Sequence, residues 1–320
     1  MEAFVGIDVS KEVLDIKYNK DGKALQVPNT PRGIGKLITQ LNKNKPQLVV
    51  MEATGGLERQ AYRLLHEAGI HVHVANPRVT HNFAKGTGKL AKTDKIDAEM
   101  LAFYAERMTP SSMTPVSKKI EGLRDVVVRR KQIVNMVTQE KNRLSASHLD
   151  DMIRAQINET IEFHEGQIEK LDEYLEKNTL EDPEMKARYD FLIKVKGVGP
   201  VSAITLLTAM PELGTMNKKQ VAALLGVAPI NNDSGKSKGY RKCMGGRAHV
   251  RAALFSATIS AIRFNPEIKE FANRLIPTKG SKGKISKLIT IACMRKMIVM
   301  LNAILRDKTD WNPEHYKKFA

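Results

Sequence analysis

The chain has only two cysteines in 320 residues, Cys243 and Cys293, and they lie far apart with no CxxC spacing. A disulfide framework or a zinc site needs more cysteines at closer spacing, so neither is expected, and a reducing cytoplasm fits. The chain also lacks a signal-peptide-like start and an uninterrupted apolar run of membrane-spanning length. The best candidate, 288–305, is interrupted by Arg295 and Lys296. We therefore expect no membrane partner.

Nucleotide-binding glycine motifs are absent as well. Segments 86–89 (GTGK) and 279–284 (KGSKGK) are rich in glycine and lysine, but neither has the GxxxxGKS/T spacing of a P-loop. ATP use is therefore not indicated. In the second segment, Lys282 and Lys284 are instead expected to contact the phosphates of a nucleic acid.

Basic residues outnumber acidic ones, and the excess lies in the last 130 residues. The net charge is +17 for the whole chain, of which 1–107 contributes +4 and 108–190 contributes −3. Residues 191–320 hold 23 basic and 7 acidic residues, a net charge of +16. This asymmetry predicts a polyanionic partner. No basic segment also carries an apolar face with aromatic anchors, so nucleic acid is favoured over a membrane surface.

The first 110 residues predict an α/β domain of the ribonuclease-H type. Three strands are followed by alternating helices and strands, which is the ribonuclease-H order of elements. The expected strands are 4–9, 13–18, 24–27, 48–51 and 70–75, and the expected helices are 31–41, 57–68 and 94–107. Residues 76–92 are expected to form a long basic loop.

The rest of the chain predicts helices. Residues 111–185 are expected to form a long helical segment, and 186–320 a mainly helical C-terminal domain. Apolar residues recur near heptad spacing in the first of these, which is typical of a coiled coil. They are Ile153, Ile157, Ile161, Ile168, Leu171 and Leu175. A helical pair within one chain and a coiled coil between two chains both fit this spacing.

Four acidic residues are the strongest candidates for catalysis. Asp8 and Glu52 each close an apolar strand, in FVGID and LVVME. Ligands bind at the carboxyl ends of the strands in an α/β sheet. Asp94 and Asp97, in KTDKIDA, are three residues apart and share one helix face. Brought together, the four offer the hard oxygen ligands that two Mg²⁺ ions need for phosphoryl chemistry. The alternatives are a turn cap for Asp8 and helix-dipole acids for Asp94 and Asp97.

Two glycines open the C-terminal domain. Gly197 and Gly199 lie in VKGVGPV, before an apolar helix that reaches residue 209. Paired glycines before a helix let backbone N–H groups approach a DNA phosphate, as in a helix-hairpin-helix motif. The pattern predicts contact with the DNA backbone that does not depend on base sequence. A plain helical turn with a glycine hinge is the alternative.

Ser234 is a candidate nucleophile in the segment 228–239, APINNDSGKSKG. A serine hydroxyl can attack a phosphodiester when a base or metal ion removes its proton. Composition alone favours the simpler interpretation that Ser234 hydrogen-bonds a phosphate or its own backbone. Ser237 competes for the same role. The expected nucleic-acid contacts around them are Lys236, Lys238 and Arg241.

Together these segments resemble the DEDD-type insertion-sequence transposases related to the Piv DNA invertase, a family of bridge-RNA-guided serine recombinases. Segments 6–11 (GIDVSK), 51–55 (MEATG) and 92–98 (KTDKIDA) are similar to the motifs of its RuvC-like domain. Segments 197–200 (GVGP) and 226–235 (GVAP to SG) are similar to those of its C-terminal transposase domain. The resemblance covers essentially the whole chain in the family's order.

The resemblance implies specific roles. Asp8, Glu52, Asp94 and Asp97 would bind Mg²⁺, with Mn²⁺ as an alternative ion, and Ser234 would form a phosphoserine link to DNA. The implied partners are donor and target DNA, a structured guide RNA from the element, and further copies in a homodimer or homotetramer. The metal-binding domain and the domain that carries Ser234 would together form one composite active site, either within one copy or between copies. The rival hypotheses are a RuvC-like junction endonuclease that uses water, without a covalent intermediate, and a catalytically inert nucleic-acid-binding protein.

Overall fold

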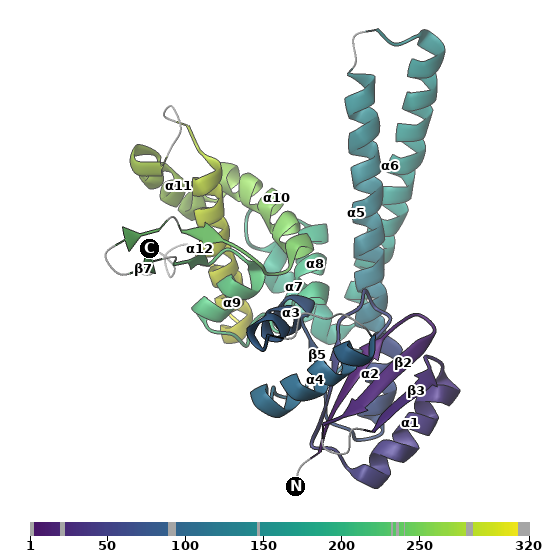
Figure 1. Cartoon of the computed structure of the whole chain (residues 1–320). Helices are drawn as coiled ribbons and strands as arrows, with labels where there is room; N and C mark the ends of the chain where they lie inside the picture. Colours follow the sequence, from purple (N-terminus) through teal and green to yellow (C-terminus); the bar gives the residue numbers. More distant parts are fainter. Residues whose placement is uncertain are drawn as a thin grey trace. The chain divides into compact units, whose positions relative to one another are not determined.

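The computed structural model describes residues 3–19, 23–88, 94–145, 148–231, 233–234, 237–239, 241–279 and 284–312. For 94–96, 233–234, 237–238 and 279 the description covers the backbone alone. The chain forms two compact units, Met1–Val116 and Ser117–Ala320 (Figure 1). The predicted helical segment and C-terminal domain thus lie in one unit, and a boundary at residue 185 stays a prediction.

The first unit is built on a five-stranded sheet with the order β3-β2-β1-β4-β5. The strands are β1 (Phe4–Val9), β2 (Val13–Tyr18), β3 (Ala24–Pro28), β4 (Leu48–Glu52) and β5 (Val72–Ala75). The first three form an antiparallel meander, and β4 and β5 continue the sheet in parallel from β1. Parallel pairs need crossover connections, which are made by α1 (Pro31–Asn44) and α2 (Arg59–Glu67). The predicted order of elements is confirmed as far as β5.

Two further helices follow β5, where one was predicted. They are α3 (Pro77–Gly86) and α4 (Asp94–Met108). The prediction that 76–92 is a loop is therefore wrong for most of its described residues. The local cause is a strong helix start, since the Asn76 side chain accepts a hydrogen bond from the Arg78 N–H and proline occupies the first helical position.

The two faces of the sheet are buried by different helices, because alternate strand residues point to opposite faces. Val5, Ile7 and Val9 pack in a cluster with residues of α1 and α2. Phe4 packs in another cluster, with Leu101 of α4 and its neighbours. Along their strands, Asp8 and Glu52 alternate in step with the residues that pack in the Phe4 cluster. Both acids therefore lie on the sheet face that α4 covers.

Gly6 allows α4 to lie close against β1. A Cβ atom at this position would be 2.1 Å from the Ala98 carbonyl oxygen and 2.4 Å from the Ala102 nitrogen. Neither backbone atom can move without shifting the helix, so the contact requires a residue with no side chain.

Replacing Gly6 with alanine is expected to lower the free energy of unfolding by about 3 kcal/mol, the upper part of the range for overpacked sites. Chemical denaturation measures this change. Gly35→Ala in α1 is the control, since a Cβ there meets nothing within 4 Å. That variant should gain about 0.5–1 kcal/mol, as alanine is the better helix former. Equal stability of the two variants would show that α4 does not pack this closely on β1.

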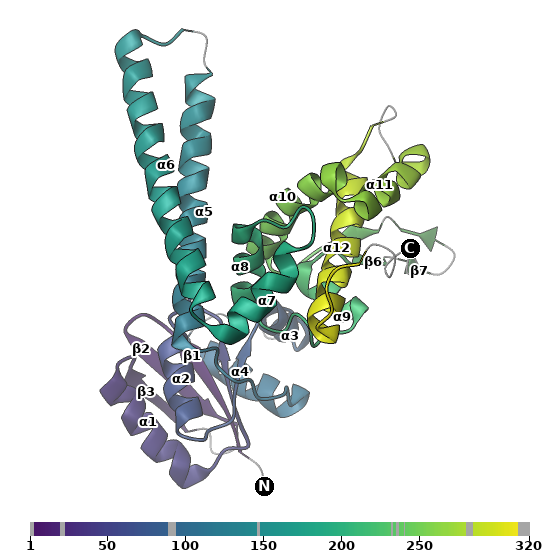
Figure 2. The same ribbon diagram turned by 180° about the vertical axis from the view of Figure 1, so that it is seen from behind.

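The second unit contains a long helical pair within one chain, formed by α5 (Lys118–Leu144) and α6 (Asp151–Leu180) (Figure 2). Val137 packs with Ile157 and Ile161 between the helices. Arg130 forms an ion pair with Asp172 across them. The pairing within the chain is thus observed, and pairing with a second chain stays a prediction.

The remainder of this unit is mainly helical, as predicted. Its helices are α7 (Pro183–Ile193), α8 (Pro200–Ala209), α9 (Lys218–Leu225), α10 (Ala248–Phe264), α11 (Pro266–Lys279) and α12 (Lys287–Asp307). Four two-residue strands lie between α9 and α10: β6 (Pro229–Ile230), β7 (Asp233–Ser234), β8 (Ser237–Lys238) and β9 (Lys242–Cys243).

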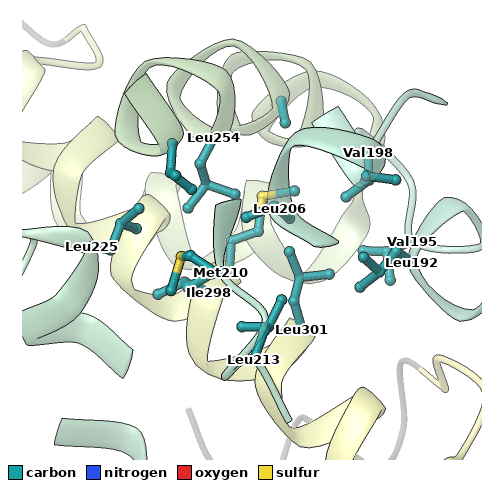
Figure 3. Packing of buried hydrophobic residues seen from close by; sticks show 14 of the residues in the cluster. Leu192, Val195, Val198, Leu206, Met210, Leu213, Leu225, Leu254, Ile298 and Leu301 are labelled. Atoms are coloured by element: carbon teal, nitrogen blue, oxygen red, sulfur yellow. The ribbon is translucent and has the colours of Figure 1, made fainter. Parts of the chain in front are cut away.

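Helix α12 is the central core helix of this unit. Its residues Ile298 and Leu301 pack with Leu206, Met210 and Leu254 (Figure 3). By length and a mean hydropathy of 1.8 it could cross a membrane, although the sequence analysis found no uninterrupted run of that length. However, 61 % of its apolar window is buried inside the protein, as expected of a core helix.

Candidate active site

Asp8 and Glu52 lie near the carboxyl ends of two adjacent parallel strands. β1 and β4 pair with Ile7 opposite Met51, and the two acids are the next residues on their strands. Both belong to the sheet face that α4 covers, and both are half-buried. Their backbone positions are therefore neighbours at the edge of the sheet formed by the carboxyl ends of its parallel strands. The sequence predicted this, because each acid closes an apolar strand.

The first turn of α4 lies at the same edge. Phe4 packs near Leu101, and Gly6 faces Ala98, so α4 runs antiparallel to β1. Two residues further along the strand, Asp8 lies about 6.6 Å beyond Gly6. That distance corresponds to roughly four helical residues, which leads from the 98–102 turn that faces Gly6 to residues 94–98, the turn that holds Asp94 and Asp97.

We therefore expect the backbone positions of all four acids to lie near the same end of the sheet. Asp97 is half-buried, and Asp94 is the first residue of α4. Among the side chains that the structure describes, which exclude that of Asp94, no three acids, histidines or cysteines are close enough to share a metal ion. Carboxylate oxygens are the donors that a hard divalent cation prefers, and a metal site formed by these four acids stays a prediction.

The Glu52 carboxylate is held by a residue that the sequence analysis missed. Thr80 of α3 donates a hydrogen bond from Oγ1 to Glu52 Oε2, at 2.6 Å. Thr80 is only 8 % exposed, so water competes little for this bond. The Asn76-Pro77 start of α3 is the sequence signal that could have placed Thr80 on a helix.

Another acid near this edge organises the turn after β4. Glu58 Oε2 accepts hydrogen bonds from the N–H groups of Thr54 and Gly56, both at 2.9 Å. Gly55 and Gly56 have φ values of 63° and 103°, which favour glycine. Glu58 therefore stabilises the backbone that follows Glu52.

The two predicted DNA-binding glycines have different surroundings. Gly197 has a φ of 103°, and a Cβ there would lie 2.6 Å from Ala261 of α10. Gly199 precedes α8 as its N-cap, and a Cβ there would meet nothing within 4 Å. Gly197 thus serves packing, whereas Gly199 leaves the start of α8 accessible, as a phosphate site requires. DNA binding by this turn stays a prediction.

Ser234 lies in a short β-ribbon formed by the strand pairs β6–β9 and β7–β8. β7 pairs with β8 so that Ser234 is opposite Ser237, and β6 pairs with β9 closer to the helices. The two candidate nucleophiles are therefore directly opposite each other on neighbouring strands. At the base of the ribbon, Arg251 Nη1 donates to the carbonyl oxygens of Leu225 and Gly245, at 3.1 and 2.6 Å.

The predicted nucleic-acid contacts are partly described. Arg241 and Lys284 are exposed, and Lys238 belongs to β8. Lys236 and Lys282 lie outside the described residues. The exposed positions are accessible to a polyanion, as predicted.

Arg247, at the start of α10, serves the fold. Its guanidinium donates to both carboxylate oxygens of Glu212, at 2.8 and 2.6 Å. Burial opposes ionisation of Glu212, but the hydrogen bond and charge of Arg247 outweigh it and lower the pKa of this carboxyl. The same arginine and partial burial lower the pKa of His249.

Comparison with known proteins finds a matching family model for each half of the chain. Residues 5–153 match a family model for DEDD transposases of the IS110 type, and residues 189–273 match the transposase IS116/IS110/IS902 family. The pilin gene-inverting protein of Moraxella bovis is 28 % identical over 318 residues, covering 95 % of this chain and 96 % of that protein. The protein of the same name from Moraxella lacunata is 27 % identical over the same shares.

One solved structure is a distant match. RuvC of T. thermophilus in complex with a Holliday junction substrate is 17 % identical, with a TM-score of 0.26, and the match covers 35 % of this chain and 100 % of that chain. This similarity is too low to support a conclusion. Residues 5–153 and 189–273 are thus similar to transposase domains of the IS110 type, and together with the inverting proteins these similarities indicate an enzyme that cleaves and rejoins DNA.

Proposed function

We propose that the chain is a Mg²⁺-dependent DNA recombinase that excises and inserts its own element through a phosphoserine intermediate, guided by an RNA from that element. Asp8, Glu52, Asp94 and Asp97 are the proposed metal ligands, and Ser234 is the proposed nucleophile. The single observation that best supports the proposal is that β1 and β4 end side by side, with Asp8 and Glu52 near their carboxyl ends, while α4 packs against β1 at Gly6.

The acids supply what DNA cleavage needs at this edge. Each is a hard oxygen donor, and together they would hold one or two divalent ions beside a phosphate. A bound Mg²⁺ would stabilise the charge that develops on the phosphate oxygens and help to deprotonate a nucleophile. Four acids beside a polyanion would repel it without such an ion, which argues against the inert nucleic-acid-binding protein.

A serine nucleophile accounts for rejoining. Attack by Ser234 Oγ forms a new bond to phosphorus while the bond to one deoxyribose oxygen breaks, and that oxygen takes up a proton. Attack by the hydroxyl of another strand reverses the step, releases Ser234 and restores a phosphodiester. Water would instead leave the strand cut. An enzyme that rejoins DNA is therefore better served by Ser234 than by water.

A covalent protein–DNA complex is the experimental test. Labelled DNA that carries the element ends is incubated with the full chain, Mg²⁺ and any RNA that co-purifies, and the reaction is stopped with detergent. We expect a slowly migrating labelled species that protease digestion removes. Cleaved DNA without this species would support the junction endonuclease that uses water.

A guide RNA fits the charge distribution. Residues 191–320 carry a net charge of +16, and both RNA and DNA backbones require cations. We expect the protein, expressed from its whole element with flanks, to co-purify with one discrete RNA that maps beside its gene. Sequencing the bound RNA tests this. A protein that binds DNA but carries no such RNA would recognise DNA directly.

We also expect a homodimer or homotetramer in the cytoplasm. Helix α6 exposes large apolar side chains, with Met152, Phe163 and Tyr174 at 71, 64 and 51 % exposure. Such residues are typical of surfaces that a second chain covers.

A further inference from the structure

Thr80 makes a short hydrogen bond with a proposed metal ligand, Glu52. Its hydroxyl has one proton and three acceptors in reach: Glu52 Oε2 at 2.6 Å, the Pro77 carbonyl at 3.0 Å and the Asn76 carbonyl at 3.5 Å. A hydroxyl donates to one acceptor at a time, and the shortest contact involves the charged one. Hydrogen bonds to a carboxylate are about twice as strong as neutral ones, so the proton belongs to Glu52.

We propose that Thr80 is a positioning residue that orients the Glu52 carboxylate for metal binding. The inference rests on the proposed function, because it takes Glu52 as a metal ligand. A glutamate side chain has three rotatable bonds, and fixing it in one orientation costs conformational entropy. A bond to Oε2 in the apo protein removes much of that freedom in advance and leaves Oε1 for a cation.

Thr80 can orient Glu52 because its own helix is anchored. Three residues further along α3, the Phe83 ring packs against Tyr104 of α4, with ring centroids 5.3 Å apart and nearly perpendicular planes. It also packs against Phe103, at 5.6 Å. The helix that restrains Glu52 is thus fixed to α4, the helix that carries Asp94 and Asp97. One scaffold therefore positions acids from both β4 and α4.

The competing explanation is that Thr80 only ties α3 to the sheet. Stability alone does not separate the two explanations, since either role predicts some loss when the bond is removed. Metal affinity does separate them. Partners that hydrogen-bond a metal ligand typically contribute 10- to 100-fold to metal affinity, whereas a helix anchor contributes to folding.

The experiment titrates Mg²⁺ into the full-length protein by calorimetry and records thermal unfolding with and without Mg²⁺. Thr80→Val keeps the shape of the side chain and removes the hydroxyl, whereas Thr80→Ser keeps the hydroxyl. Thr39→Val is the matched control, because Thr39 in α1 is exposed and donates to the Gly35 carbonyl of its own helix, at 3.1 Å. Glu52→Gln serves as the reference for loss of the ligand itself.

Thr80→Val should weaken Mg²⁺ binding at least about 10-fold and reduce the rise in Tm on adding Mg²⁺. Thr80→Ser and Thr39→Val should stay within about threefold of the unsubstituted protein. Unchanged affinity in Thr80→Val, with loss in Glu52→Gln, would overturn the inference and leave the metal site standing. Equal affinity in Glu52→Gln and the unsubstituted protein would overturn both, since Glu52 would not be a ligand.

Discussion

Replacing Ser234 with alanine is expected to abolish the covalent protein–DNA complex and, with it, strand exchange. The substitution removes the only atom of the side chain that can form a bond to phosphorus, so no residual adduct at this position is chemically possible. Binding of DNA should persist, because the surrounding cations are unchanged. Detergent-stable complexes are counted on denaturing gels, and DNA binding is measured by mobility shift.

Ser237→Ala is the matched control for this experiment. Ser237 is directly opposite Ser234 in the β7–β8 pair, in the same basic surroundings, and its loss should leave the adduct intact. An adduct that persists in Ser234→Ala and disappears in Ser237→Ala would assign the nucleophile to Ser237. Either result distinguishes two residues that composition cannot separate.

Asp8→Asn is expected to reduce strand cleavage by roughly 10³-fold, equivalent to about 4 kcal/mol of transition-state stabilisation. The Asp8 carboxylate accepts a hydrogen bond from the Val9 N–H at 3.0 Å, and an asparagine oxygen can accept the same bond. The fold and nucleic-acid binding should therefore survive, while one charged oxygen ligand is lost. Cleavage of labelled DNA is measured over a range of Mg²⁺ concentrations.

Glu67→Gln is the control for loss of an acid in the same unit. Glu67 is exposed at the end of α2, and its neutralisation should leave cleavage unchanged. If Asp8→Asn cleaves as fast as this control, the metal site is not at the edge formed by β1 and β4. If both variants lose activity together with their folded structure, the loss would reflect stability, which denaturation measurements would reveal.

Much of the first unit could be predicted from local sequence. β1 and β4 are short apolar runs, and their last residues include the acids that face α4. Because parallel strands align their carboxyl ends, Asp8 and Glu52 could be placed together without any knowledge of side-chain packing. The helix start at Pro31 was equally plain, since proline is well suited to the first helical position.

Helix α3 could not be predicted as readily, because its stability comes from distant residues. Its ten residues are too few for a stable isolated helix. Two contacts hold it in place. The Phe83 ring packs against aromatic rings of α4, and Thr80 donates a hydrogen bond to Glu52, which is 28 residues away in sequence. The role of Thr80 was hidden for the same reason. The two-residue strands around Ser234 were missed because two residues are too few to show an alternating pattern.

The close approach at Gly6 has a consequence for genetics. A screen for mutants that no longer transpose will recover substitutions at Gly6 as readily as those at Asp8, because every other residue adds a Cβ against the α4 backbone. Glycine has no functional group, so phenotype alone would misassign this position as catalytic. In the proposed dimer or tetramer, dominance would sort such alleles: a folded Asp8 mutant would join active copies and inactivate the assembly, whereas a Gly6 mutant that fails to fold would not.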